Sequence, residues 1–371
     1  MNYWQIANKK LYNYGNMKIV YPDFKNSLIN VAASIQKRFG KAVSFPTIKE
    51  LDEAIKNKKH VIVLLLDGLG INVLKANLSP SSFLRLHLVK EITSVFPSTT
   101  ASATTAFLQA KLPGKTGWFG WHQYFPSMNA NIIMFNNYDY YTGELKNENE
   151  KNRFIKYHEF GYDLDCEYET LWPAFKEGGF NNLKSMLEYA LKLANSDEET
   201  FTYCYWDNPD TLLHCNGVSH KLVKDYLISV DKMLDVINSK KKDDTAFIII
   251  ADHGVLDVEA IRLDKYSDVY KYLTKLPSVE GRAQVFYVSD KEGFKLAFNK
   301  EFSKYFDLYE TDDFIKMGMV GEVKPEFRHF LGDFIAIAKD KYYFTIKDEE
   351  PMRAHHAGVT EEEMMIPLII F

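Results

Sequence analysis

Stretches of consecutive apolar residues, each closed by a polar turn, recur along the chain. Residues 60–66 are almost continuously apolar and end at Asp67-Gly68, and residues 247–251 end at Asp252-His253. Residues 201–206 have the same character. Such a run is typical of a strand that is buried on both faces, as in a parallel sheet. These segments therefore predict the central strands of a parallel sheet.

Between these strands, apolar residues recur at helical spacing. The pattern predicts helices over 27–38, 48–56, 78–90, 171–177, 182–194 and 218–238. It also predicts a strand over 92–96, and a helix that begins near Thr100 and ends before Pro113. Because strands and helices alternate, the expected fold class is α/β, with a central, mostly parallel sheet sandwiched by helices.

The pattern changes after residue 257. Residues 259–345 mix helices with short strands, such as 283–288 and 334–338, and carry few residues of the kind that perform chemistry. A final strand is predicted over 366–371. We therefore expect a catalytic core over 1–258, completed by 346–371, and an inserted α+β cap over 259–345. Within the core, residues 117–160 are expected to be irregular and rich in aromatic side chains.

Composition and charge restrict the class of protein. The chain has 371 residues, of which 46% are hydrophobic and 26% charged, as is ordinary for a soluble globular protein. A net charge of −5 argues against a nucleic-acid-binding surface and predicts no attraction to a membrane. The three cysteines show no CxxC spacing, and no basic-then-apolar signal segment occupies residues 1–15. We expect a cytoplasmic setting without disulfides.

Polar residues that can bind a metal follow four of the predicted strands. They are Asp67, Thr100, Asp210 and Asp252-His253. Ligands of open α/β sheets bind beyond the carboxyl ends of the strands, where these residues fall. Asp210 and His214 are also spaced i, i+4, which puts both side chains on one face of a helical turn. Taken singly, each of these segments is explained more simply as a turn or as an ion pair on the surface. Together they indicate a site of carboxylate and imidazole ligands that suits Zn²⁺.

The candidate nucleophile lies at the start of the predicted helix near Thr100. A hydroxyl there is close to free N–H groups and to the positive end of the helix dipole, which suits an alkoxide and an incoming phosphate. The simpler alternative is a threonine that only caps the helix. Thr99 is the alternative nucleophile on the same segment.

These pieces together resemble the alkaline phosphatase superfamily, and most closely the type I phosphodiesterase/nucleotide pyrophosphatase family. The matching segments are 63–68, 96–100, 209–214, 251–254 and 356–360, in the order that the family has them. The distance from Thr100 to Pro113 also resembles the family's spacing between nucleophile and proline, which favours Thr100 over Thr99.

The resemblance implies two divalent metal ions, with Zn²⁺ preferred and Mn²⁺ as the alternative. The residues implied for the first ion are Asp67, Thr100, Asp252 and His253. Those implied for the second are Asp210, His214 and His356, with His355 as the alternative to His356. The implied activity is hydrolysis of phosphodiester or pyrophosphate bonds in a small, nucleotide-like substrate, through a phosphothreonine intermediate. A phosphomonoesterase or phosphonate hydrolase on the same site, and a non-catalytic metal-bound regulatory or binding module, are the alternatives.

The chain departs from the family at one position that concerns the phosphate. Eukaryotic-type members carry an Asn that helps to hold the phosphate, and the matching position here is Trp121. His122 or Asn216 are candidates for a replacement. Trp121 and its aromatic neighbours could stack on a flat leaving group, although packing onto the core is the simpler reading. Arg353 could contact a phosphate oxygen, or be an ordinary surface residue.

Overall fold

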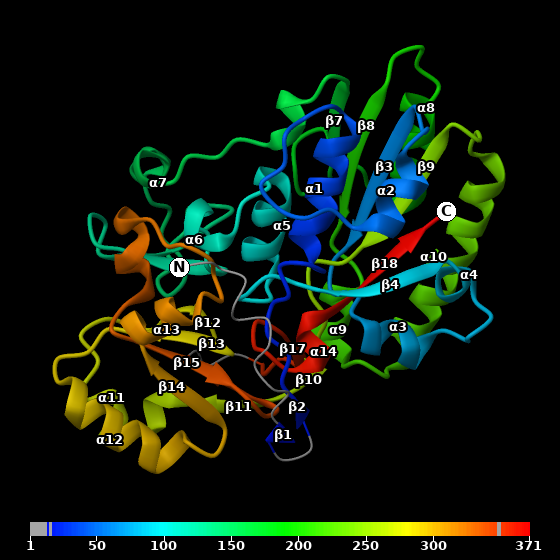
Figure 1. Ribbon diagram of the computed structural model, residues 1–371. Coiled ribbons are helices and arrows are strands. Elements are labelled where there is room, and N and C mark those ends of the chain that lie inside the picture. Colours follow the sequence, from blue (N-terminus) through cyan, green and yellow to red (C-terminus); the bar gives the residue numbers. More distant parts are fainter. Residues whose placement is uncertain (1–12, 15–16, 347–349) are drawn as a thin grey trace. The chain divides into compact units, whose positions relative to one another are not determined.

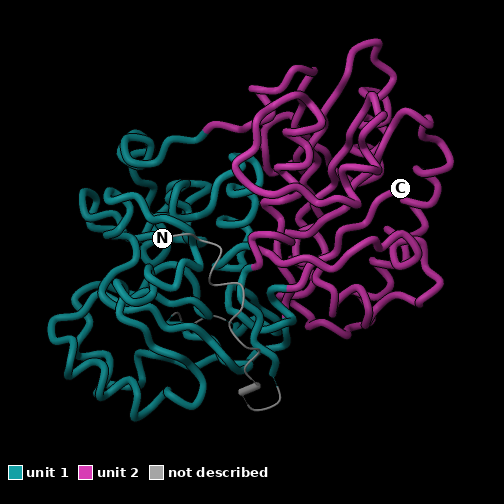
Figure 2. Tube along the Cα trace, viewed as in Figure 1, with its two compact units in different colours: residues 1–22, 95–157, 256–364 teal, residues 23–94, 158–255, 365–371 magenta. Residues whose placement is uncertain are grey.

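The computed structural model describes residues 13–14, 17–346 and 350–371 (Figure 1). They form two compact units (Figure 2). Unit 1 takes its residues from 1–22, 95–157 and 256–364, and unit 2 consists of 23–94, 158–255 and 365–371. The expected cap, 259–345, lies in unit 1 together with 95–157. The expectation about a signal segment falls largely on residues 1–12 and 15–16, which are outside the described residues.

Unit 2 is built on a six-stranded sheet in the order β4-β18-β9-β3-β8-β7. The strands are β4 (Leu88–Thr93), β18 (Met365–Ile370), β9 (Thr245–Ile250), β3 (His60–Leu66), β8 (Thr200–Trp206) and β7 (Glu167–Leu171). β3 runs parallel to β8 and β9, and β7 runs parallel to β8. Only β18 runs in the direction opposite to the other strands of this sheet. The predicted central, mostly parallel sheet is therefore confirmed.

The central strands of unit 2 are buried along their whole length, as their apolar sequences predict. The helices of this unit are α1 (Leu28–Arg38), α2 (Lys49–Ile55), α3 (Ile71–Asn77), α4 (Phe83–Leu86), α8 (Leu183–Leu193), α9 (Asp210–Asn216) and α10 (Lys221–Lys240), with a 3-10 turn η2 (Phe160–Asp163). α10 buries an apolar stripe at a spacing of three to four residues, which packs one face of the helix inward. Because β3, β8 and β9 are parallel and in register, they deliver the residues that follow them to one edge of the sheet.

Unit 1 contains an antiparallel sheet in the order β14-β15-β13-β12-β5-β6. Its strands are β14 (Phe306–Glu310), β15 (Phe334–Ala338), β13 (Ala283–Phe286), β12 (Ser278–Glu280), β5 (His122–Phe125) and β6 (Ala130–Ile133). Alternate residues enter two different hydrophobic clusters: Val285 and Ile335 belong to one, and Phe286 and Phe334 to the other. Both faces of the middle strands are therefore covered.

The other elements of unit 1 surround this sheet. The helices are α5 (Thr100–Gln109), α6 (Pro113–Thr116), α7 (Glu148–Phe154), α11 (Ser267–Tyr270), α12 (Lys291–Phe302), α13 (Thr311–Met317) and α14 (Glu361–Met364), with 3-10 turns η3 (Leu263–Lys265) and η4 (Pro325–Leu331). Three strand pairs complete the unit: β1 (Asn13–Tyr14) with β2 (Met17–Lys18), β10 (Leu256–Asp257) with β17 (Ala354–His355), and β11 (Glu259–Arg262) with β16 (Tyr342–Thr345). The helix predicted to begin near Thr100 is thus confirmed.

Four local predictions are wrong. The strand predicted over 92–96 lies at 88–93 instead. Residues 171–177 form no helix, because Pro173 disfavours helical backbone at the residue before it, and Leu171 instead ends β7. Of the helix predicted over 78–90 only α4 forms, since 88–93 pair with β18. Residues 117–160 are not merely irregular: β5 and β6 form a hairpin at the end of the unit 1 sheet.

Two further observations concern the described residues as a whole. Their helices include none that combines the length and the apolar character needed to cross a membrane. Cys166, Cys204 and Cys215 are free thiols. Burial raises the pKa of Cys166 to about 12, so this thiol stays protonated at neutral pH.

Candidate active site

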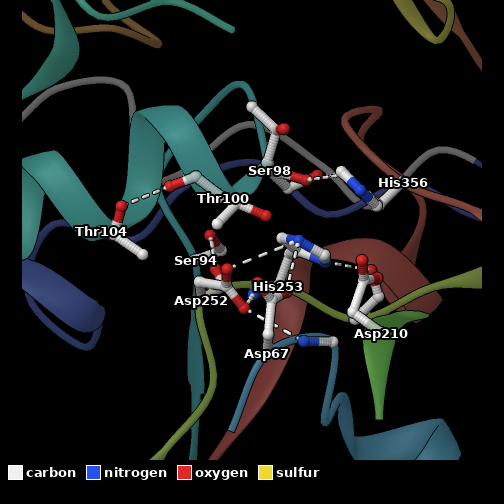
Figure 3. Close-up of polar contacts among 12 residues, drawn as sticks. Asp67, Ser94, Ser98, Thr100, Thr104, Asp210, Asp252, His253 and His356 are labelled. Carbon is white, nitrogen blue, oxygen red and sulfur yellow. Dashed lines mark hydrogen bonds and ion pairs between the residues drawn. The ribbon is translucent and has the colours of Figure 1, made fainter. Parts of the chain in front are cut away.

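The ends of β3 and β9 bring two carboxylates and an imidazole together in unit 2 (Figure 3). Asp67 follows β3 directly, and Asp252-His253 follow β9 after one residue. His253 Nε2 lies 3.3 Å from Asp67 Oδ1 and 3.5 Å from Asp252 Oδ2. All three side chains are almost completely buried. One ligand atom from each lies within 4.8 Å of the others, so a single metal ion can contact all three.

The hydrogen bonds of this cluster define which atoms face its centre. His253 Nδ1 lies 3.1 Å from the carbonyl oxygen of Gly254, which can only accept, so Nδ1 donates and Nε2 is the ring nitrogen that faces Asp67 and Asp252. Asp252 Oδ1 accepts hydrogen bonds from the backbone N–H groups of Gly68 and His253. Asp252 Oδ2 is buried and accepts none within the described part of the chain. A cation is the group that satisfies such an arrangement.

The charges of the cluster also indicate that it binds a cation. Loss of solvation raises the pKa of Asp67 well above its usual value, and the negative charges of Asp252 and Asp210 raise it further. Burial also raises the pKa of Asp252, partly opposed by His253. Several carboxylates are thus held together in a dry place, which is unfavourable without a compensating positive charge. Oxygen and imidazole nitrogen donors without a thiolate fit Zn²⁺ or Mn²⁺.

Asp210 and His214 form a second group at the same sheet edge. Asp210 is the first residue of α9, and His214 Nε2 lies 3.0 Å from Asp210 Oδ2, as the i, i+4 spacing predicts. The backbone N–H of Asp210 donates to the carbonyl of Asp67 at 3.0 Å. Gly68 has φ +73°, and a Cβ there would lie 2.9 Å from the Cβ of Asp210. A glycine at position 68 is therefore required for the turn after β3 to approach the start of α9 this closely.

Tyr205 is a residue of this cluster that sequence reasoning missed. It lies in β8, directly beside β3, and its hydroxyl donates a hydrogen bond to Asp67 Oδ2. Carboxylate ligands of metals are commonly oriented by such a second hydrogen bond. The signal available in the sequence was its position near the carboxyl end of a predicted central strand.

Unit 1 carries the candidate nucleophile at the start of α5. Thr99 is the N-cap residue and Thr100 the first helical residue. The hydroxyl of Thr99 donates to Glu280 Oε1 at 2.7 Å, inside a buried environment. The backbone N–H of Trp121 donates to the same oxygen at 2.8 Å. Glu280, which sequence reasoning also missed, therefore accepts hydrogen bonds from both the hydroxyl of Thr99 and the backbone of Trp121.

His356 lies beside the nucleophile segment within unit 1. Its Nδ1 is 3.2 Å from the carbonyl oxygen of Ser98, so this nitrogen donates (Figure 3). The hydroxyl of Ser98 donates to the carbonyl of Gly358 at 2.8 Å. His355, the alternative ligand, belongs to β17, and its ring packs edge-on against those of Tyr343 and His356.

The candidate substrate contacts are less closely grouped. Trp121 is 39% exposed, and its ring lies 5.7 Å from that of Phe135. His122 is buried in β5 and stacks on Tyr140 at 3.9 Å. Arg353 is exposed just before β17. Asn216, in unit 2, donates its side-chain N–H to the carbonyl of Leu212 within α9. Of these residues, the aromatic ring of Trp121 offers the largest exposed flat surface.

Comparison with known proteins identifies the family. The family model described as type I phosphodiesterase / nucleotide pyrophosphatase matches residues 61–361. The chain belongs to this family. It is therefore a metal-dependent phosphoric ester hydrolase of the alkaline phosphatase superfamily, as the resemblance predicted. A search of the curated proteins found no match.

Solved structures of the family share the fold. Murine ectonucleotide pyrophosphatase / phosphodiesterase 5 has a TM-score of 0.64 and 15% sequence identity, covering 83% of this chain and 87% of that one. An inactive variant of the same murine protein, in complex with AMP, has the same TM-score and coverage at 14% identity. The human counterpart has a TM-score of 0.62 at 15% identity and the same coverage. At these identities the likeness concerns the fold alone.

Proposed function

We propose that the chain hydrolyses phosphodiester or pyrophosphate bonds on a two-metal site, through a covalent phosphothreonine at Thr100. The observation that carries the proposal is the buried cluster of Asp67, Asp252 and His253. Two carboxylates and an imidazole nitrogen crowd together there, and burial together with the negative charges of Asp252 and Asp210 raises the pKa of Asp67. A divalent cation resolves this conflict, and hydrolases of this family are metal-dependent.

The motif order of the family supports the division of ligands between two ions. The first ion would be held by Asp67, Thr100, Asp252 and His253. The second would be held by Asp210, His214 and His356. Zn²⁺ is preferred, with Mn²⁺ as the alternative, because the donors are carboxylate, hydroxyl and imidazole groups. Bound ions supply Lewis acidity, which lowers the pKa of a hydroxyl and neutralises charge on phosphate oxygens.

The chain's own residues perform the remaining steps. The oxygen of Thr100 bonds to phosphorus while the bond to the leaving oxygen breaks on the opposite side, and the hydroxyl proton passes to solvent. The N–H groups at the start of α5 stabilise the negative oxygens of the phosphate. Water then attacks phosphorus, breaks the bond to the Thr100 oxygen and restores the hydroxyl. We assign the nucleophile to Thr100 instead of Thr99 because the distance from Thr100 to Pro113 resembles the family's spacing between nucleophile and proline, and because the hydroxyl of Thr99 donates to Glu280.

A nucleotide-like substrate fits two observations. The murine relative has been solved in complex with AMP. In this chain, the ring of Trp121 is 39% exposed, and an exposed aromatic ring can stack on a base. His122 and Arg353 complete the proposed set of substrate contacts, Arg353 as a bidentate partner of a phosphate.

A substrate panel on Zn²⁺-loaded protein tests the proposal. The panel contains an aryl phosphodiester, a nucleotide pyrophosphate, a phosphomonoester and a phosphonate. We expect turnover of the diester or pyrophosphate, its loss in Thr100→Ala, and retention of bound Zn²⁺ by that variant. Thr99→Ser, which keeps the hydroxyl for Glu280, should remain active. Faster turnover of the monoester or the phosphonate would reassign the substrate, and two bound ions without any hydrolysis would favour a binding module.

A further inference from the structure

A fully buried ion pair joins Arg282 to Glu363 in unit 1. Both side chains have no exposed surface. Arg282 Nε lies 2.6 Å from Glu363 Oε1, and Nη2 lies 2.9 Å from Oε2, so the pair is bidentate. Nη1 of Arg282 donates to the backbone carbonyls of Asp340 and Tyr342 at 2.8 Å each. Burying two charges carries a large desolvation penalty, so such a pair is not explained by stability alone.

Glu363 also binds the loop that precedes α14. Its Oε1 accepts the backbone N–H of Gly358 at 2.7 Å, and its Oε2 accepts both the backbone N–H and the hydroxyl of Thr360. Thr360 and Glu363 have the spacing of a capping box, in which the acidic residue reaches back to the N-cap. A Cβ at Gly358 would lie 2.6 Å from Glu363 Oε2. The carboxylate of Glu363 therefore binds residues 358–360 so closely that no side chain fits at position 358.

The same loop carries a strained residue next to His356. Ala357 has φ +95°, which residues other than glycine rarely adopt, and it is completely buried. Such a conformation persists only where the surroundings over-determine it, and it concentrates at functional sites. The loop is fixed on one side by the hydroxyl of Ser98, which bonds to the Gly358 carbonyl, and on the other side by Glu363.

We infer that Arg282 and Glu363 are positioning residues for His356. The ion pair fixes the carboxylate, the carboxylate fixes the 358–360 backbone, and this backbone holds Ala357 in its strained conformation and the imidazole of His356 in one orientation. The inference rests on the proposed function, in which His356 is a metal ligand. Removing groups that orient a metal ligand typically lowers metal affinity about 10–100-fold.

Zn²⁺ titration against a chromophoric chelator, on folded full-length protein, tests the inference. Glu363→Gln keeps the size of the side chain but removes its charge, and it should weaken one of two Zn²⁺ affinities about 10–100-fold. The other affinity, which belongs to the Asp67, Asp252 and His253 cluster, should not change. Glu361→Gln is the matched control, because Glu361 lies at the start of the same helix, is partly exposed and pairs with Lys18. It should leave both affinities as in the wild type.

His356→Ala identifies which binding event belongs to the loop and separates the two hypotheses. If this variant loses the same event that Glu363→Gln weakens, the inference is supported. If His356→Ala loses one event while Glu363→Gln, folded by circular dichroism, binds both ions normally, the pair is structural only and the inference is overturned. Wild-type protein that binds no Zn²⁺ would instead refute the proposed function. Arg282→Lys, which keeps the charge but loses the bidentate contact, serves the same comparison if Glu363→Gln does not fold.

Discussion

Replacing Gly68 with alanine tests whether metal binding depends on the close approach between the turn after β3, which carries Asp67, and the start of α9, which carries Asp210. The substitution has two costs. Gly68 has φ +73°, and a Cβ in the left-handed region costs about 1–2 kcal/mol. The new Cβ would also lie 2.9 Å from both Cβ and Oδ1 of Asp210, and such overpacking adds about 1–3 kcal/mol. We expect Gly68→Ala to lower the free energy of unfolding by about 2–5 kcal/mol and to weaken Zn²⁺ binding, since Asp210 must move.

Gly178 offers a matched control in the same unit. Its φ is +76°, but no atom lies within 4 Å of the position that a Cβ would occupy. Gly178→Ala should therefore show only the backbone cost of about 1–2 kcal/mol and no change in Zn²⁺ affinity. Urea unfolding of metal-free protein gives the stabilities, and chelator competition gives the affinities. Equal losses of stability in the two variants, with equal Zn²⁺ affinity, would refute the role assigned to the close approach.

Three further predictions concern buried polar groups. Thr99→Val leaves Glu280 without one of its donors and should lower the free energy of unfolding by about 1–3 kcal/mol in urea titration, whereas Thr99→Ser should match the wild type. Asp252→Asn removes one of the crowded carboxylates, so it should raise the urea midpoint of metal-free protein and lower Zn²⁺ affinity more than tenfold; a lower midpoint would contradict the electrostatic argument. Burial lowers the pKa of His60 below its usual 6.5, so the imidazole stays neutral in the fold but gains a proton on unfolding. Stability should therefore be complete above pH 6.5 and fall as the pH drops from 6.5 toward the lower folded pKa. The charged groups around His60 are Asp244, Lys59, Lys242 and Glu199. His60→Asn, which preserves a partner for Thr200, should flatten this slope in unfolding experiments, and an unchanged slope would show that other groups cause it.

The strands and turns of unit 2 could be predicted because their signals are local. The apolar run 60–66 coincides with β3, and the polar residues after β3 and β9 lie together because parallel neighbours end at one edge. The family resemblance rests on the same short segments. One wrong prediction arises where distant residues decide the structure: 88–90 become a strand because they pair with β18, at the opposite end of the sequence.

The supporting residues of the candidate site could not be predicted, for the same reason. Glu280 lies 181 residues from the hydroxyl that it binds, and Arg282 lies 81 residues from Glu363. No periodicity or spacing relates such partners. Tyr205 is an intermediate case, since its strand was predicted but its pairing with β3 was not.

The two-metal site is tested most directly by the number of Zn²⁺ equivalents that the purified chain binds, measured by elemental analysis after dialysis against a weak chelator. We expect two equivalents per chain for the wild type and a smaller number for Asp252→Asn. A wild-type chain that is folded and takes up no divalent metal would contradict it.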